Sequence, residues 1–197
     1  MKRDFDFDPV RVAYFEANGW RAYYDRKWLR LLRLIIGLCQ EQFRIPFPVS
    51  LVAANYVTRA AAAWAPIEHD DRVVEAYYER FYRLARRYSG LRFDPAQVAA
   101  LEFRYNEVHR RLVGQDDKTE FVEAMVALHS AIFGLVPEQA HPSAEWRVQA
   151  NNTVDLITLG KSTDVEGDWQ KLEELLRRCY RSIREALTQQ RVMTHPT

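Results

Sequence analysis

Apolar residues recur at helical spacing through most of the chain, and no stretch of useful length alternates between apolar and polar positions. Helix start signals repeat: Asp8-Pro9 and Asp94-Pro95 each place a capping residue before a proline at the first helical position. Glycines such as Gly134 then supply stops. The pattern predicts an all-α fold, a compact bundle of seven or eight antiparallel helices joined by short turns. The expected helices cover roughly residues 9–18, 20–43, 50–65, 71–88, 95–113, 117–133, 144–159 and 164–190.

One expected helix is apolar on most of its circumference. Residues 28–43 read WLRLLRLIIGLCQEQF, and Ile36 lies at the middle of the apolar face. The stripe left for water is narrow and consists of Arg26, Arg30, Arg33, Gln40 and Glu41. A helix of this kind needs neighbours on several sides. We therefore expect the helix near residues 20–43 to run through the centre of the bundle.

Composition narrows the functional classes. The 197 residues suit a single domain over 1–197, and 28 basic against 27 acidic residues give a net charge of +1. This balance argues against nucleic acid or an acidic membrane as a partner. The only two cysteines, Cys39 and Cys179, show no pairing pattern, and residues 1–9 lack the apolar run of a signal peptide. We expect a cytoplasmic protein.

Common catalytic signatures are absent from the sequence. His69-Asp70 has the letters of a metal phosphohydrolase dyad, but no histidine precedes His69, and helix capping explains the aspartate equally well. Glu138 and His141 have ExxH spacing, but they lie between two prolines, where we expect a loop rather than a helix face.

Several polar side chains fall on or beside apolar helix faces. His129 follows Met125 by one helical turn on such a face, so it either satisfies its hydrogen bonds within the core or binds something. Glu102 and His109 stack two turns apart at the edge of a core stripe that contains Tyr105. They could supply two metal ligands or an acid/base pair, or form a surface ladder.

A second polar series follows at i+4 steps: Arg147, Asn151 and Asp155. It is either an exposed ladder or the wall of a polar pocket. Arg59 is the only charged residue between Ser50 and Pro66, in an alanine-rich helix. We expect it to extend its charged end to solvent or to pair with a buried acid, Asp155 or Glu102.

The spacing Glu102-x6-His109 resembles the first ligand pair of the haem-oxygenase-like di-metal oxidases, which are all-α proteins. That family has a later helix reading His-x3-Asp-x2-His. This chain instead has Asn151, Asp155 and Thr158, so both histidines are missing and no family is assigned.

Two functional hypotheses follow. The first is a helical protein, enzymatic or not, with a polar pocket between helices for a small molecule or metal, formed by Arg59, Glu102, Tyr105, His109, His129 and Asp155. The second is an interaction or structural subunit that binds a partner or a second copy of the chain. Its basis is the aromatic content, including Tyr23, Tyr24 and Trp28. Neither a cofactor nor a metal can be specified from the sequence, and neither nucleic acid nor a membrane is expected as a partner.

Overall fold

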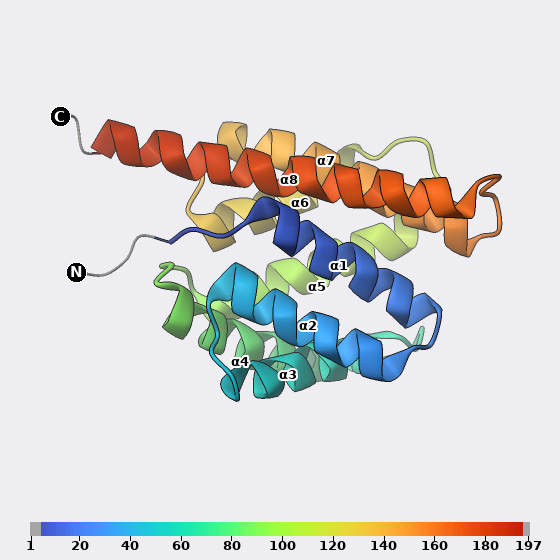
Figure 1. The fold of residues 1–197 in the computed structure, drawn as a ribbon, viewed down its shortest axis with the longest axis horizontal. Helices are drawn as coiled ribbons and strands as arrows, with labels where there is room; N and C mark the ends of the chain where they lie inside the picture. The colour runs from blue at the N-terminus through green and yellow to red at the C-terminus, as the bar shows by residue number, and fades with distance from the viewer. Residues whose placement is uncertain (1–4, 195–197) are drawn as a thin grey trace.

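The computed structural model describes residues 5–194, in which eight helices and no strand are present (Figure 1). The all-α prediction is therefore confirmed. Residues 1–4, which belong to the stretch examined for a signal peptide, lie outside the described part. The helices are α1 (Pro9–Tyr24), α2 (Trp28–Phe43), α3 (Val49–Trp64), α4 (Asp71–Ser89), α5 (Pro95–Leu112), α6 (Thr119–Phe133), α7 (Pro137–Thr158) and α8 (Val165–Thr194).

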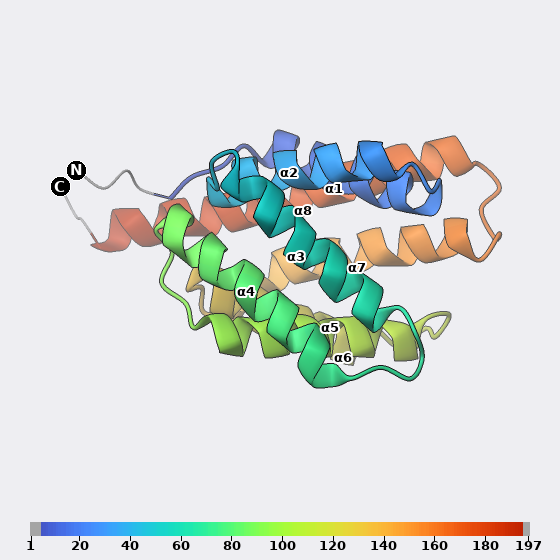
Figure 2. The ribbon, with the colours of Figure 1, turned by 90° about the horizontal axis from the view of Figure 1, so that it is seen from below.

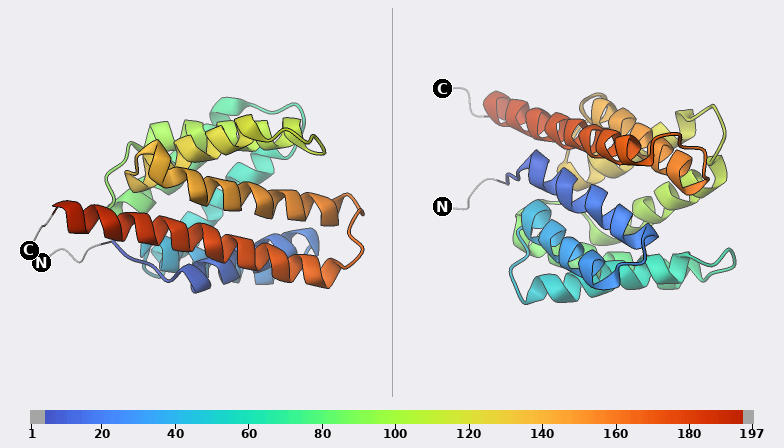
Figure 3. Two further views of the ribbon diagram at one scale, coloured as in Figure 1. Left: turned by 90° about the horizontal axis from the view of Figure 1, so that it is seen from above. Right: turned by 45° about the vertical axis from the view of Figure 1, so that its right-hand side comes forward.

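The helices form a closed ring in chain order. Each helix packs against the next, and α8 packs against both α7 and α1, which closes the ring (Figures 1 and 3). The turns that follow α1, α3, α5 and α7 gather at one end of the bundle, as Figure 2 shows. This end is called the odd-turn end below. Side chains that point inward from α1, α5, α7 and α8 can therefore meet although they are far apart in the sequence.

Capping residues set several helix starts as expected. The carboxylates of Asp8, Asp70 and Asp94 each accept a hydrogen bond from the backbone N–H two residues later, at 2.9–3.1 Å. At the other end of α4, Gly90 adopts a left-handed φ of 81°, which glycine tolerates without steric cost.

The expected boundary at Gly19 is wrong. Helix α1 continues through Gly19 to Tyr24, and α2 begins only at Trp28. A glycine inside a helix costs about 1 kcal/mol, which packing along α1 can offset. The chain instead reverses at residues 25–27, where Arg26 has a left-handed φ of 57°.

The prediction that α2 is the central helix is also wrong. Of its residues only Leu34, Cys39 and Phe43 are buried, while Trp28 is 58% and Leu29 78% exposed. Helix α2 packs on α1, α3 and α4 as a member of the ring, and its remaining side is exposed at the edge of the bundle (Figure 2). Its sequence is more apolar than its position in the structure requires.

Helix α7 begins earlier than expected. It starts at Pro137 and includes Pro142, so Glu138 and His141 are helical and not in a loop. A proline inside a helix leaves the carbonyl four residues earlier without its N–H partner. Here that carbonyl belongs to Glu138, an exposed residue of the first turn, where water can take the place of the missing donor.

The core is one cluster of buried apolar side chains drawn from all eight helices, including Val12, Phe43, Phe81, Phe121 and Leu176. The single domain over 1–197 stays a prediction. Within the described residues, none of the helices has the length and apolar character needed to cross a bilayer.

Candidate functional site

An ion pair lies in the interior of the helix ring. Arg147 of α7 and Glu16 of α1 approach to 2.6 Å, and their side chains are only 12% and 9% exposed. The hydroxyl of Tyr180, on α8, donates to the other Glu16 oxygen at 2.5 Å. Three helices thus share one buried polar contact, which is the beginning of a larger network.

The surroundings of Arg147 keep it charged. Burial alone would lower the pKa of its guanidinium, but the Glu16 carboxylate, acting together with Tyr105, Tyr180 and Cys179, outweighs burial and raises the pKa above its usual value. The guanidinium also lies 4.9 Å from the ring centroid of Trp20. A buried charge needs such compensation because desolvation costs several kcal/mol per ion.

From Arg147 the network continues to α5 through Tyr105. The Arg147 Nε atom donates to the Tyr105 hydroxyl oxygen at 3.4 Å, and Nδ2 of Asn151 donates to the same oxygen at 2.5 Å. Burial is the main cause of the raised pKa of Tyr105. Asn151 is itself buried, and its Oδ1 atom has no hydrogen-bond partner among residues 5–194. One acceptor in the network therefore remains unused.

The network ends at a histidine–aspartate pair near the odd-turn end. His109 Nε2 lies 3.1 Å from both carboxylate oxygens of Asp155, and the side chains are 19% and 14% exposed. If Nε2 carries the proton donated to Asp155, Nδ1 can accept from Asn151 Nδ2, which lies 3.5 Å away. This pair is the part of the network that solvent reaches.

Aromatic rings hold the pair in place. The His109 ring stacks on Phe121 with centroids 4.9 Å apart and planes 4° apart, and Phe121 also stacks on Tyr105 at 5.2 Å. Tyr24, at the end of α1, is exposed over about half of its surface, but the surrounding protein still partly desolvates it, and this desolvation together with the charge of Asp155 raises its pKa to about 12. Its ring lies 6.5 Å from that of Trp169.

Three of the six predicted site residues therefore meet: Tyr105, His109 and Asp155. The series Arg147, Asn151 and Asp155 faces inward, as the pocket-wall alternative required, and is not an exposed ladder.

Arg59 and Glu102 do not join this network. Arg59 is exposed and donates to the hydroxyl of Tyr77 at 3.2 Å, so the expected pairing with Asp155 or Glu102 is wrong. Glu102 accepts from the Tyr82 hydroxyl at 2.9 Å. Burial raises the pKa of Glu102, while this hydrogen bond acts in the opposite direction.

His129 has its own closed contact. It is buried, and its Nδ1 atom lies 2.8 Å from the Ser143 hydroxyl, which itself donates to the Ala140 carbonyl at 2.7 Å. Nδ1 must then carry the proton. Burial lowers the pKa of His129 to about 3, and the charge of Arg147 adds to the effect. His129 is a neutral core histidine.

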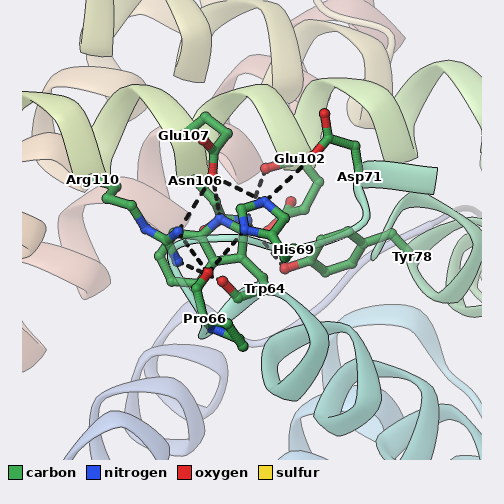
Figure 4. A network of polar contacts seen from close by, with 9 residues as sticks. All are labelled: Trp64, Pro66, His69, Asp71, Tyr78, Glu102, Asn106, Glu107 and Arg110. Atoms are coloured by element: carbon green, nitrogen blue, oxygen red, sulfur yellow. Dashed lines mark hydrogen bonds and ion pairs between the residues drawn. The ribbon is translucent and has the colours of Figure 1, made fainter. Parts of the chain in front are cut away.

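A second polar cluster surrounds His69 at the turn between α3 and α4 (Figure 4). His69 Nδ1 lies 2.9 Å from the Pro66 carbonyl, and Nε2 lies 3.5 Å from Asp71 and 3.7 Å from Glu107. Asp70, the other residue of the His69-Asp70 pair, caps α4, as the capping interpretation expected. The turn residues Glu68 to Arg72 line an open depression of about 670 Å³.

Arg110 fixes this cluster to α5. Its guanidinium stacks 3.6 Å from the Trp64 ring centroid and donates to the Trp64 carbonyl at 2.6 Å. The indole N–H of Trp64 donates to Glu107 at 2.5 Å. Glu107 is thus already engaged, and these contacts account for the cluster as an attachment of the α3–α4 turn to α5.

Sequence reasoning missed Glu16 and Tyr180. A signal for Glu16 was present: it follows Val12 by four residues and precedes Ala17, so it lies on the buried face of α1. A carboxylate at that position requires a partner. The identity of the partner, Arg147, depends on how the ring closes.

No group of three or more histidine, cysteine, aspartate or glutamate side chains within residues 5–194 is arranged to hold a metal ion. Glu102 and His109, which resemble a ligand pair in sequence, bond instead to Tyr82 and Asp155. Neither a family model, nor a curated protein, nor a solved structure matches the chain.

Proposed function

We propose that the protein binds a small molecule bearing an amino group at the partly exposed end of its polar network, where the His109 and Asp155 side chains are 19% and 14% exposed. The observation that carries the proposal is the His109–Asp155 pair, which solvent reaches and which lies beside the unused buried acceptor Asn151 Oδ1. Ligand sites in helical bundles are usually built from polar side chains that converge between helices in this way.

The chemistry of the available groups points to a hydrogen-bond donor. Asp155 retains lone pairs beyond those that face His109, and Asn151 Oδ1 can only accept. The nearest buried positive charge, on Arg147, is already compensated by Glu16. The ring of Tyr24, which is 48% exposed, has a face that attracts cations. A small organic amine fits this combination, and no reaction is assigned to the site.

Thermal unfolding in the presence of small mono- and diamines tests the proposal. We expect at least one amine to raise Tm with a saturable concentration dependence, because a ligand that binds only the folded state stabilises it. Asp155→Asn should abolish this shift. Glu145→Gln is the matched control, since it removes a carboxylate from an exposed histidine pair, His141–Glu145 at 3.8 Å.

Two outcomes would refute amine binding: no amine that shifts Tm, or a shift that Asp155→Asn leaves unchanged. Native mass spectrometry of the purified protein provides an independent readout, since a bound amine appears as added mass that Asp155→Asn should remove.

A second candidate function, an interaction subunit, is favoured by a different observation. The turn between α1 and α2 exposes Tyr23, Trp28 and Leu29 together. A cluster of exposed apolar side chains on a protein surface is typical of a site that binds another molecule. The oligomeric state and the cytoplasmic location stay predictions.

A further inference from the structure

We propose that the turn between α1 and α2 docks onto an anionic lipid surface. This surface, called the basic–aromatic tip, consists of Tyr23, Arg26, Lys27, Trp28, Leu29, Arg30 and Arg33. The proposal is independent of amine binding at Asp155 and makes the interaction function specific by naming the partner.

The apolar part of the tip is continuous and exposed. Every residue from 23 to 30 is exposed, with Tyr23 at 43%. The Tyr23 ring meets the Trp28 ring edge to face, with centroids 6.1 Å apart. Leu29, next to Trp28, is among the most exposed apolar residues described. Tryptophan and tyrosine are enriched where proteins meet the bilayer interface.

Positive charge is concentrated at the same place. Residues 23–33 contain four basic side chains and one acidic one, Asp25, which gives a local charge of +3. Asp25 is paired with Lys27 at 2.8 Å, whereas Arg26 and Arg33 have no carboxylate partner among the described residues. Arg30 donates to the neutral side chain of Asn18. Basic residues free to approach an anionic leaflet strengthen membrane attachment.

The size and charge of the tip favour a lipid surface over other partners. The turn lies at the odd-turn end of the bundle, where the turn between α7 and α8 extends further out (Figures 1 and 3). One short turn and the residues beside it offer little of the roughly 800 Å² per partner that a stable protein interface needs. A second copy placed tip to tip would bring the two sets of arginines together, and like charges repel. An interfacial lipid layer can accept inserted aromatic and leucine side chains without a preformed groove.

Backbone contacts hold the tip in one conformation. Lys27 N donates to the Ala22 carbonyl at 2.8 Å, and Arg26 N donates to the Tyr23 carbonyl at 3.0 Å. Near the end of α1, the Arg21 guanidinium forms a 2.7 Å ion pair with the Glu166 carboxylate at the start of α8. A surface that is already ordered loses little conformational entropy when it binds.

The whole-chain charge of +1 gives no indication of this surface, because acidic residues elsewhere balance the total. The sequence-based expectation of no membrane partner rested on that total. A peripheral contact depends on local charge instead, and it requires no spanning helix.

Co-sedimentation with lipid vesicles tests the proposal. We expect the full chain to bind phosphatidylcholine vesicles that contain about one-third phosphatidylserine and to bind pure phosphatidylcholine far more weakly. Binding should fall as salt is raised toward 1 M, where the Debye length shrinks to about 3 Å. Arg26→Gln with Arg33→Gln should weaken binding roughly 30-fold. Leu29→Gln should weaken it as well.

Matched variants separate the tip from general effects. Arg104→Gln with Arg181→Gln removes the same charge from exposed positions outside the tip, and Ile67→Gln removes an exposed isoleucine from the α3–α4 turn. Both should bind like the unchanged protein. The proposal is overturned if the unchanged protein ignores anionic vesicles, if the control charges matter as much as the tip charges, or if a soluble acidic protein is bound in place of lipid.

Discussion

Glu16 and Arg147 form a 2.6 Å ion pair inside the helix ring and join α1, near one end of the chain, to α7. Tyr180 of α8 bonds to the same carboxylate. The first and last helices are therefore joined by a polar contact as well as by apolar packing. Each charge is tolerable in the interior only while the other is present.

Removing one member of this pair should be much worse than removing both. We expect Arg147→Met to destabilise the protein by about 3–5 kcal/mol, because it leaves the Glu16 carboxylate buried without compensation. The double variant with Glu16→Leu should lose less stability than either single variant, because no buried charge is then left unpaired. Urea unfolding of all four proteins gives the coupling energy. The exposed pair Arg83–Glu79 is the control and should show only about 0.3–0.5 kcal/mol.

His129 should make stability depend on pH. Its pKa is about 3 in the folded protein, against 6.5 when exposed, so the unfolded chain binds the additional proton between these values. The stability from the neutral imidazole is fully present above pH 6.5 and is lost as pH falls toward 3, by up to about 4–5 kcal/mol. His129→Leu should fold, and its unfolding free energy should fall less steeply over this window. Equal slopes for the two proteins would show that His129 is accessible to solvent.

The peripheral position of α2 changes what its substitutions should do. Ile36 is only half-buried, so Ile36→Asp should leave a folded protein, although a central helix would not tolerate it. Phe43, by contrast, is buried with its ring 5.7 Å from Phe81. Phe43→Ala should cost about 3–5 kcal/mol. Thermal unfolding of the two variants, followed by circular dichroism, gives the comparison. An unfolded Ile36→Asp protein would show that α2 belongs to the core after all.

The same glycine-to-alanine change should have opposite effects in α1 and α2. A Cβ atom at Gly37 would lie 2.5 Å from the Phe15 ring, so Gly37→Ala should destabilise the protein by about 1–3 kcal/mol. A Cβ atom at Gly19 meets nothing within 4 Å, so Gly19→Ala should stabilise α1 by up to about 1 kcal/mol. Melting temperatures that shift in the same direction would show that the α1–α2 contact adjusts.

Local sequence determined the helices and most of their starts. Asp70 and Asp94 cap the helices that they were predicted to open, because capping depends only on the two or three residues that follow. Gly19 and Pro142 misled the prediction, since a glycine or proline inside a helix carries a cost that tertiary packing can offset. The sequence showed that Arg147, Asn151 and Asp155 share one helix face. It did not show whether that face points to the core or to solvent.

Only the tertiary structure decided which helix lies outside and which polar groups meet. Apolar periodicity shows which residues of α2 share a face but not how many neighbours that face receives, and ring closure left much of the face exposed. The partners of Glu16 and His109 come from distant helices, because contact across a bundle depends on helix order and rotation rather than on spacing along the chain. The sequence by itself thus determined the eight helices and the candidate polar residues. The closing of α8 onto α1 determined the network that they form.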